Sequence, residues 1–228
     1  MAILGKKAKA PEGSDNIFWT TMADLLLGLA IIFMTLFVLA MTGFSQNSVQ
    51  QKQEQIKASE ELIEKLEKEN IKAEVDKMTG DIKISDLELF ELNSWTLSPK
   101  GKQYLDKLIP IYVDTIFSKE ELLEGINNIV VQGHTDSQSF SGLKTREEQF
   151  TKNMELSLKR ANSVAEYMFK TNYNKNYSEQ LRNKVVVEGK SFNEPILDAN
   201  GKEDFAKSRR VELKLTVKRW DIMQALGF

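Results

Sequence analysis

The most apolar part of the chain is a continuous run between Phe18 and Phe44. No charged residue interrupts it from Leu25 to Met41, and with its flanks the run reaches the roughly 20 residues that a membrane-spanning helix needs. A cleaved signal peptide is the competing interpretation, but its apolar core is only about 7–15 residues long and ends at a small-residue cleavage site. The longer core, which no A-x-A-like site follows, favours a retained transmembrane helix over residues 17–44.

The charges on either side of this run predict its orientation. Lys6, Lys7 and Lys9 precede the run, whereas the first cation after it is Lys52. Because cationic flanks stay on the cytoplasmic side, residues 1–16 are expected to be cytoplasmic and everything after the span to lie outside. The chain is therefore predicted to cross the membrane once, with its bulk on the far side.

One acidic residue, Asp24, lies within the predicted span. An ionised carboxylate in a membrane helix costs at least about 2.5–3.5 kcal/mol, so it marks a candidate functional site. At about 100° per residue, Gly28 and Thr35 fall on the same helical face as Asp24. Thr20 and Thr21 flank this stripe and carry hydroxyl groups suited to a sodium ion. The stripe is a candidate lining for an ion path.

Two interpretations of Asp24 stay open. In the first, its carboxylate reaches headgroup water at the cytoplasmic interface and has no further role. In the second, it binds and releases an ion, because a potential of about 100 mV supplies about 2.3 kcal/mol per charge, comparable to the cost of burial. A single span encloses no channel, so the second interpretation requires helices from partner subunits. The pattern does not choose between proton and sodium.

A polar segment rich in Gln, Glu and Lys follows the span, over residues 45–78. Its weak heptad pattern has a first seam of Val49, Ile56, Ile63 and Asn70 and a second seam that holds Leu66 and Ala73. The pattern predicts a helical stalk that pairs in parallel with a second copy, in which a lone Asn sets the register. A solvated single helix or a flexible linker fits the composition equally well, so these alternatives stay open.

Residues 79–228 alternate short apolar strands with amphipathic helices. Strands are predicted at 82–84, 129–131, 185–187 and 211–217, and helices at 99–116 and 158–168, with a polar loop from Ser137 to about Lys152. Ser98 is the expected cap of the first helix and Pro99 its first residue, whereas Pro110 is a candidate kink. Strands separated by helices predict an α/β sandwich in which helices cover one face of a small sheet.

Composition narrows the function classes. The chain has 31 Lys and Arg against 33 Asp and Glu, a net charge of −2, so no surplus of cations indicates nucleic-acid binding. It has no Cys and one His, which makes a thiolate or His-rich metal site and a His-based catalytic triad improbable. No acid/base pair with a nucleophile stands out, so the chain is not expected to be an enzyme, and no cofactor or metal is predicted.

Four motifs occur in order along the last domain: GHTDS at 133–137, NMELSLKRANSV at 153–164, EGKSFNEP at 188–195 and SRRVEL at 208–213. Together they resemble the OmpA-like peptidoglycan-binding domain, over approximately residues 82–217. The second motif fits the family pattern N-x-x-L-S-x-x-R-A-x-x-V at every fixed position. The resemblance implies that this domain binds the diaminopimelate-type stem peptide of the bacterial cell wall.

The family's ligand-binding acid corresponds to Asp136 and its arginine to Arg160. This assignment makes chemical sense, because a zwitterionic amino-acid end needs a carboxylate for its ammonium and a guanidinium for its carboxylate. Arg160 is expected one turn into a helix, where it can converge with Asp136 on one pocket. Asn153 and Ser157 match motif positions too, and are expected to orient the loop and cap the helix rather than touch ligand.

Three further motif residues are expected to be structural. Arg209 and Arg210 match the family's final-strand arginines and are assigned to a salt bridge, and His134 to a structural position. The loop from Ser137 to Lys152 is longer than in the simplest members of the family, so it is expected to reshape the pocket entrance.

The span motif, Phe18-Trp19 through Ala23-Asp24-Leu25, precedes a stalk and a wall-binding domain. This combination resembles the MotB/ZorB-type B subunits of ion-driven rotary stators. The resemblance implies a pair of B subunits inside a pentameric ring of multi-span A subunits in the bacterial inner membrane. The N-terminus is then cytoplasmic, the last domain is periplasmic, and the residue aligned with Asp24 carries the ion.

Within that family, the residues after Phe44 carry no convincing apolar stripe before Ile56, whereas flagellar members usually have an amphipathic plug there. This difference favours a ZorB-like anti-phage defence motor over a flagellar stator. The alternative from another class is a passive tether between membrane and cell wall, in which Asp24 translocates no ion.

Overall fold

The computed structural model describes residues 13–91, 94–138 and 140–217. The chain divides into two compact units, Met1–Gln50 and Gln51–Phe228, which are considered separately. Most of the predicted cytoplasmic segment, residues 1–16, lies outside the described residues.

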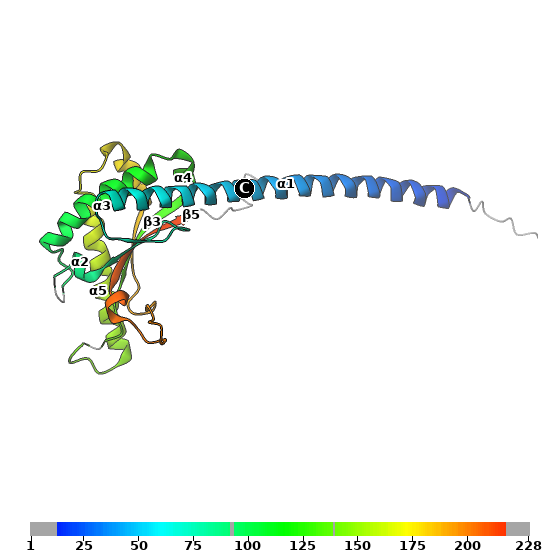
Figure 1. Cartoon of the computed structure of the whole chain (residues 1–228). Coiled ribbons are helices and arrows are strands. Elements are labelled where there is room, and N and C mark those ends of the chain that lie inside the picture. Colours follow the sequence, from blue (N-terminus) through cyan, green and yellow to red (C-terminus); the bar gives the residue numbers. More distant parts are fainter. Residues whose placement is uncertain (1–12, 92–93, 139, 218–228) are drawn as a thin grey trace, which may run out of the picture. The chain divides into compact units, whose positions relative to one another are not determined.

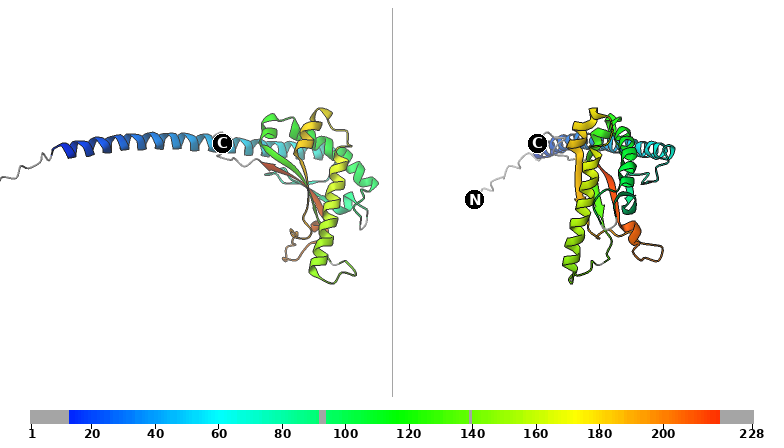
Figure 2. Two further views of the ribbon diagram at one scale, coloured as in Figure 1. Left: turned by 180° about the vertical axis from the view of Figure 1, so that it is seen from behind. Right: turned by 90° about the vertical axis from the view of Figure 1, so that its left-hand side faces the viewer.

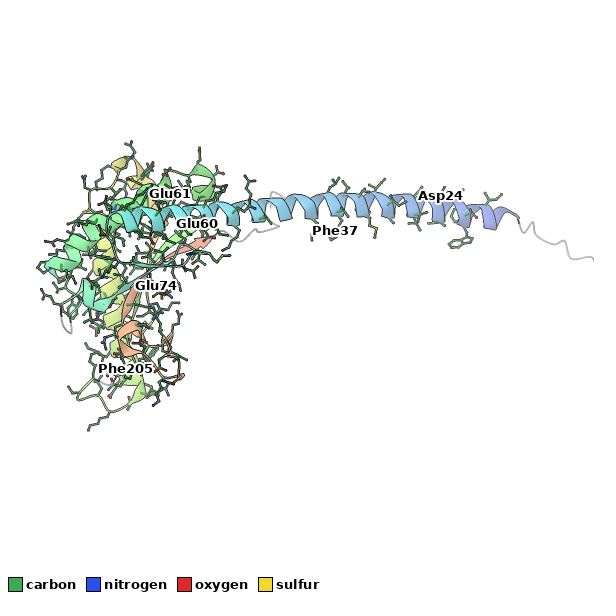
Figure 3. The ribbon with its side chains drawn as sticks, viewed as in Figure 1. Asp24, Phe37, Glu60, Glu61, Glu74 and Phe205 are labelled. Atoms are coloured by element: carbon green, nitrogen blue, oxygen red, sulfur yellow. The ribbon has the colours of Figure 1, made fainter. Side chains whose placement is uncertain are left out.

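The first unit is built on the N-terminal part of helix α1 (Gly13–Lys68). Its stretch Ile17–Met41 has 25 residues and a mean hydropathy of 2.5, so this part of the helix is long and apolar enough to cross a membrane. Its apolar side chains are exposed and do not pack in a protein core. Asp24 and Phe37 project from this stretch (Figure 3). The prediction of an N-terminal apolar helix is therefore confirmed.

Helix α1 ends earlier than the predicted stalk, which was expected to reach Met78. The amide of Ile71 donates to the carbonyl of Leu66 at 2.9 Å and that of Asn70 to Glu67 at 3.0 Å. Asn70 has a φ of 53°, so the two bonds and this left-handed residue form a Schellman motif. Asn70 therefore terminates the helix, because Asn tolerates this conformation, and is not a register-setting residue of a coiled coil.

The last turns of α1 belong to the second unit. Ala58, Leu62 and Leu66 are buried in the same apolar core as the sheet. The side-chain amide of Gln55 also donates to the Thr79 carbonyl at 2.7 Å. The predicted boundary between stalk and domain at residue 79 is thus too late, since Leu66, assigned to a coiled-coil seam, packs inside its own domain.

Among the described residues, the sheet of the second unit has five strands in the order β1-β2-β5-β3-β4. They are β1 (Glu74–Val75), β2 (Ile82–Ser85), β3 (Ile126–His134), β4 (Val185–Gly189) and β5 (Arg210–Val217). β3 and β5, two neighbours in this order, are labelled in Figure 1. β3 and β4 run parallel, and the other pairs are antiparallel. The four predicted strands are confirmed, and within the described ranges the two-residue β1 is the one strand that the prediction missed.

Seven helical segments follow α1 among the described residues. They are α2 (Asp86–Leu89), α3 (Pro99–Phe117), α4 (Glu120–Gly125), α5 (Arg146–Met168), a 3-10 turn (Lys175–Tyr177), α6 (Ser178–Lys184) and α7 (Phe205–Ser208). The Ser98 hydroxyl caps α3 by accepting from the Gly101 amide at 2.9 Å, as predicted, and Pro110 lies inside α3 without ending it.

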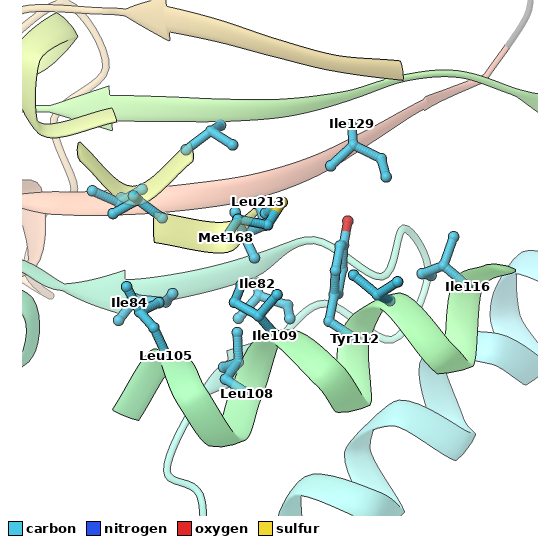
Figure 4. Packing of buried hydrophobic residues seen from close by; sticks show 14 of the residues in the cluster. Ile82, Ile84, Leu105, Leu108, Ile109, Tyr112, Ile116, Ile129, Met168 and Leu213 are labelled. Carbon is cyan, nitrogen blue, oxygen red and sulfur yellow. The ribbon is translucent and has the colours of Figure 1, made fainter. Parts of the chain in front are cut away.

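One face of the sheet carries the core. Since side chains alternate across a strand, Ile82, Ile129 and Leu213 point to the same face. There they meet apolar side chains of α3, including Leu105 and Tyr112 (Figure 4), and of α5. Figure 2 shows the ribbon of the same domain from two further sides. The predicted α/β sandwich with helices on one face is confirmed.

The start of α5 differs from the prediction of a loop to about Lys152. Thr145 accepts from the Glu148 amide at 3.1 Å, while the Glu148 carboxylate accepts from the Thr145 amide at 3.0 Å. This capping box starts the helix at Arg146, and its T-x-x-E signature was present in the sequence. Asn153 and Ser157 therefore lie inside α5 and do not cap it, and Arg160 lies well beyond the first turn.

Candidate functional site

Chain topology gathers charged residues at one edge of the sheet. Ser85 at the end of β2 and His134 at the end of β3 both pair with Arg210 at the start of β5. The residues just beyond these three positions, Asp86, Asp136 and Arg209, therefore emerge at the same edge. Sequence reasoning found Asp136 from its motif but missed Asp86, whose only local signal is an acid directly after a strand.

Arg160 reaches this edge from α5 and is held on two sides. Its Nη2 lies 3.1 Å from Oδ2 of Asp86, and its Nε donates to the carbonyl of Ser94 at 3.1 Å. The guanidinium carbon lies 5.4 Å from the ring centroid of Phe90. Burial lowers the pKa of Arg160, and the adjacent Asp86 carboxylate opposes this shift. The pair keeps a buried guanidinium neutralised within the domain.

Asp136 has a different partner. Its Oδ2 accepts a short hydrogen bond from Nη1 of Arg209, and its Oδ1 accepts from the amide of Gln138 at 3.3 Å. The Arg209 side chain is 29% exposed, whereas only 4% of the Arg160 side chain is exposed. Arg209, assigned to a structural salt bridge, thus makes that salt bridge with a predicted ligand-binding acid.

The predicted pair, Asp136 and Arg160, therefore lies in one electrostatic cluster, in which Asp136 acts on the pKa of Arg160. Each of the two is nevertheless paired with another residue, Asp136 with Arg209 and Arg160 with Asp86. The site is therefore a set of two carboxylates and two guanidinium groups, which offers both negative and positive charge at one place.

Asn153 and Ser157 are buried residues of α5. The Ser157 hydroxyl donates to the Met154 carbonyl at 2.9 Å and accepts from the Ser191 amide, in the loop after β4, at 3.1 Å. The side-chain amide of Asn153 donates to the Gln149 carbonyl at 2.9 Å. Ser157 thus ties the helix that carries Arg160 to the loop after β4, whereas the hydrogen bond of Asn153 stays within α5.

His134 lies on the opposite face of the sheet from the core. Its Nε2 is 3.0 Å from Oε1 of Gln132 and 3.9 Å from a Glu212 carboxylate oxygen. Burial, together with the positive charge of Arg210, lowers the pKa of His134 to about 3. The imidazole is therefore neutral at physiological pH and is not poised as a general acid or base.

The stripe predicted in the span lies on α1. The Thr21 hydroxyl donates to the Ile17 carbonyl at 3.0 Å, and the Thr35 hydroxyl donates to the Ile32 carbonyl at 2.8 Å. A Cβ atom added at Gly28 would meet no described atom within 4 Å. Within the described residues, no group of three or more His, Cys, Asp or Glu side chains is arranged to hold a metal ion.

An apolar helix that can span a membrane, a mixed sheet with helices on one face, and a charge cluster at one sheet edge together define a membrane-anchored OmpA-like protein. The OmpA family matches residues 89–209, more than half of the chain, and the protein belongs to this family. The family resemblance drawn from the four sequence motifs is confirmed.

Two curated relatives match almost the whole chain. Zorya protein ZorB from Escherichia coli strain Crooks is 30% identical and covers 93% of this chain and 93% of its own length. A second Zorya protein ZorB, from Escherichia coli O139:H28, is 23% identical and covers 92% of this chain and 85% of its own length. The similarity therefore includes the spanning helix as well as the folded domain.

The fold also resembles solved structures. A putative MotB like protein from Desulfovibrio vulgaris superposes with a TM-score of 0.53 and 19% identity, covering 76% of this chain and 97% of that chain. At this identity the likeness establishes the fold alone.

Proposed function

We propose that the protein is the B-type subunit of an ion-driven rotary motor in the bacterial inner membrane, anchored to peptidoglycan by its OmpA-like domain. The observation that carries this proposal is the match to ZorB over 93% of the chain, because a match of that length covers both the Asp24-bearing span and the OmpA-like domain of this protein. The same relative favours a ZorB-like anti-phage motor over a flagellar stator.

Wall binding is assigned to the charge cluster at the sheet edge. Asp136 receives the ammonium of a diaminopimelate-type stem peptide, and Arg160, held by α5, receives a carboxylate. Asn153 and Ser157 act indirectly: Ser157 ties α5 to the loop after β4, and Asn153 bonds within the helix that carries Arg160. The two acids and two bases already neutralise one another, so a zwitterion enters without adding net charge to a partly buried site.

Ion transfer is assigned to Asp24, with Thr20, Thr21, Gly28 and Thr35 lining the path. A single helix encloses no path of its own, so the proposal requires multi-span A subunits, arranged as a pentameric ring around a pair of these chains. The N-terminus is cytoplasmic, since the cations flanking the span precede it, and the OmpA-like domain is periplasmic. Anchoring to the wall prevents the pair from spinning freely when the ring turns.

Wall binding is tested by sedimentation of the full-length protein, in detergent, with purified peptidoglycan sacculi. Asp136→Ala and Arg160→Ala are expected to reduce the bound fraction by about tenfold, because each removes a charge-assisted contact. Asp114→Ala, which removes an exposed acid of α3, is the matched control and is expected to bind as the unmodified protein does. Unchanged binding in both site variants would refute the pocket.

Partnership is tested by purifying the protein together with the product of its neighbouring gene. A multi-span membrane protein that co-purifies in a ratio of five to two is the expected result. If no such partner exists and Asp24 can be replaced without effect, the passive tether is the better description.

A further inference from the structure

Asp86 carries a buried carboxylate oxygen that the rest of the site does not use. Its side chain is 10% exposed, and its Oδ2 pairs with Nη2 of Arg160 at 3.1 Å. Its Oδ1 has no hydrogen-bond partner among the residues that the structure describes. Buried polar atoms are nearly always hydrogen-bonded, so an unused acceptor inside a charge cluster is a candidate contact for a donor group of a bound ligand.

Two backbone hydrogen bonds hold the main chain of Asp86 in place. The Asp86 amide donates to the carbonyl of Arg209 at 3.0 Å, and the Asp86 carbonyl accepts from the Phe90 amide at 2.9 Å. Arg209 in turn binds Asp136 through its guanidinium. The carboxylates of Asp86 and Asp136 thus belong to one connected set of contacts, although they come from different strand ends.

Charge limits what the missing donor can be. Burial raises the pKa of Asp86, while Arg160 and Arg209 oppose this shift. A neutral donor would satisfy the hydrogen-bonding capacity of Oδ1, but Arg160 would remain the only positive charge in contact with the Asp86 carboxylate. An ammonium has three donors and a positive charge, so it can serve two carboxylates at once and free part of Arg160 for an anion.

We propose that Asp86 is a second acidic binding residue, whose Oδ1 accepts an N–H of the stem peptide's side-chain ammonium while its Oδ2 keeps Arg160 in place for a ligand carboxylate. This inference rests on the proposed wall binding and adds a second residue that binds the ammonium together with Asp136. Recognition of the amine is then shared by β2 and β3, and a peptide without that amine brings its carboxylate into the cluster with no positive charge of its own to balance it.

The test uses the full-length protein in detergent and two synthetic tripeptides. One is L-alanyl-γ-D-glutamyl-meso-diaminopimelate, and the other carries 2-aminopimelate, which lacks only the side-chain amine. The unmodified protein is expected to prefer the amine by about tenfold or more, the range of a charged hydrogen bond. In Asp86→Asn this preference is expected to fall to about threefold or less.

The two peptides separate ligand contact from mere positioning. If Asp86 only orients Arg160, or if water occupies its Oδ1, Asp86→Asn weakens both peptides by the same factor and the preference persists, which overturns the inference. Asp114→Asn is the matched control and is expected to keep the preference.

Folding is checked by circular dichroism, because Asp86→Asn leaves Arg160 without its counter-ion. Should that variant unfold, Asp86→Glu keeps the charge but moves the carboxylate by one methylene, and it too is expected to lower the amine preference. An unchanged preference in the folded variant overturns the inference. Failure of the unmodified protein to bind either peptide would instead overturn the proposed wall binding on which the inference rests.

Discussion

The carbonyl oxygen of Ser157 on α5 lies so close to Gly133 of β3 that a Cβ atom at Gly133 would stand 2.0 Å from it. Backbone therefore packs directly on backbone where α5 crosses the sheet. This contact sets the height of α5 above the strands and so positions Arg160, one turn further along, at the edge where Asp86 and Asp136 emerge.

Replacing Gly133 with alanine is expected to force α5 away from the sheet. Because the obstructing atom is backbone and cannot rotate away, Gly133→Ala should lower the free energy of unfolding by about 3 kcal/mol. Chemical denaturation of the full-length protein, followed by circular dichroism, measures this loss. Gly142→Ala is the control, since Gly142 has a φ of 90° but open space around it, and about 1 kcal/mol is expected. Equal losses in both variants would contradict the close packing.

Truncation of Leu62 tests whether the end of α1 belongs to the folded domain. Leu62 is fully buried in the core, so Leu62→Ala is expected to cost about 2–5 kcal/mol of unfolding free energy. Glu60→Ala, on the exposed side of the same helix, should change it by no more than about 0.5 kcal/mol. If Leu62→Ala is as mild as Glu60→Ala, the helix end is a separate stalk after all.

The single histidine gives a pH prediction. Burial, with Arg210, Lys214 and Lys190 nearby and only Glu212 opposing, lowers the folded-state pKa of His134 from 6.5 to about 3. The unfolded chain therefore binds a proton that the folded chain does not, and stability falls as pH decreases from about 6.5 toward 3. The melting temperature of His134→Gln should fall less over this range than that of the unmodified protein.

Nuclear magnetic resonance checks the same point directly, because the imidazole signals belong to one residue. They are expected to stay constant between pH 8 and pH 5, about the range in which an ordinary histidine titrates. A midpoint near pH 6.5 in the folded protein would show that His134 is hydrated.

The acid in the span gives a prediction about the motor. Asp24→Asn keeps the size of the side chain but removes its charge, so ion flux through the assembled complex should be lost while sacculus binding is retained. Flux into liposomes that contain this protein and its multi-span partner, driven by an imposed proton or sodium gradient, measures the effect. Asp24→Glu is the control and should retain part of the flux. Full flux in Asp24→Asn would exclude Asp24 as the ion carrier.

Local patterns were enough to predict the main strands and the family. The alternation from Val211 to Val217, the apolar run 129–131 and the Ser98-Pro99 helix start are all decided by neighbouring residues. The spanning helix is also a local property, since length and hydropathy suffice. Asp136 and Arg160 were found because their motifs are contiguous in sequence.

Tertiary structure decided what those patterns could not. A heptad stripe does not specify the surface that it packs against, and the structure places Leu66 against its own sheet, with Asn70 ending the helix. Asp86 and Arg209 joined the site only because β2 and β3 both end beside the start of β5. Strand order is a long-range property, because it is set by how buried faces pair after folding. Local sequence patterns therefore do not show that residues from different strands lie side by side.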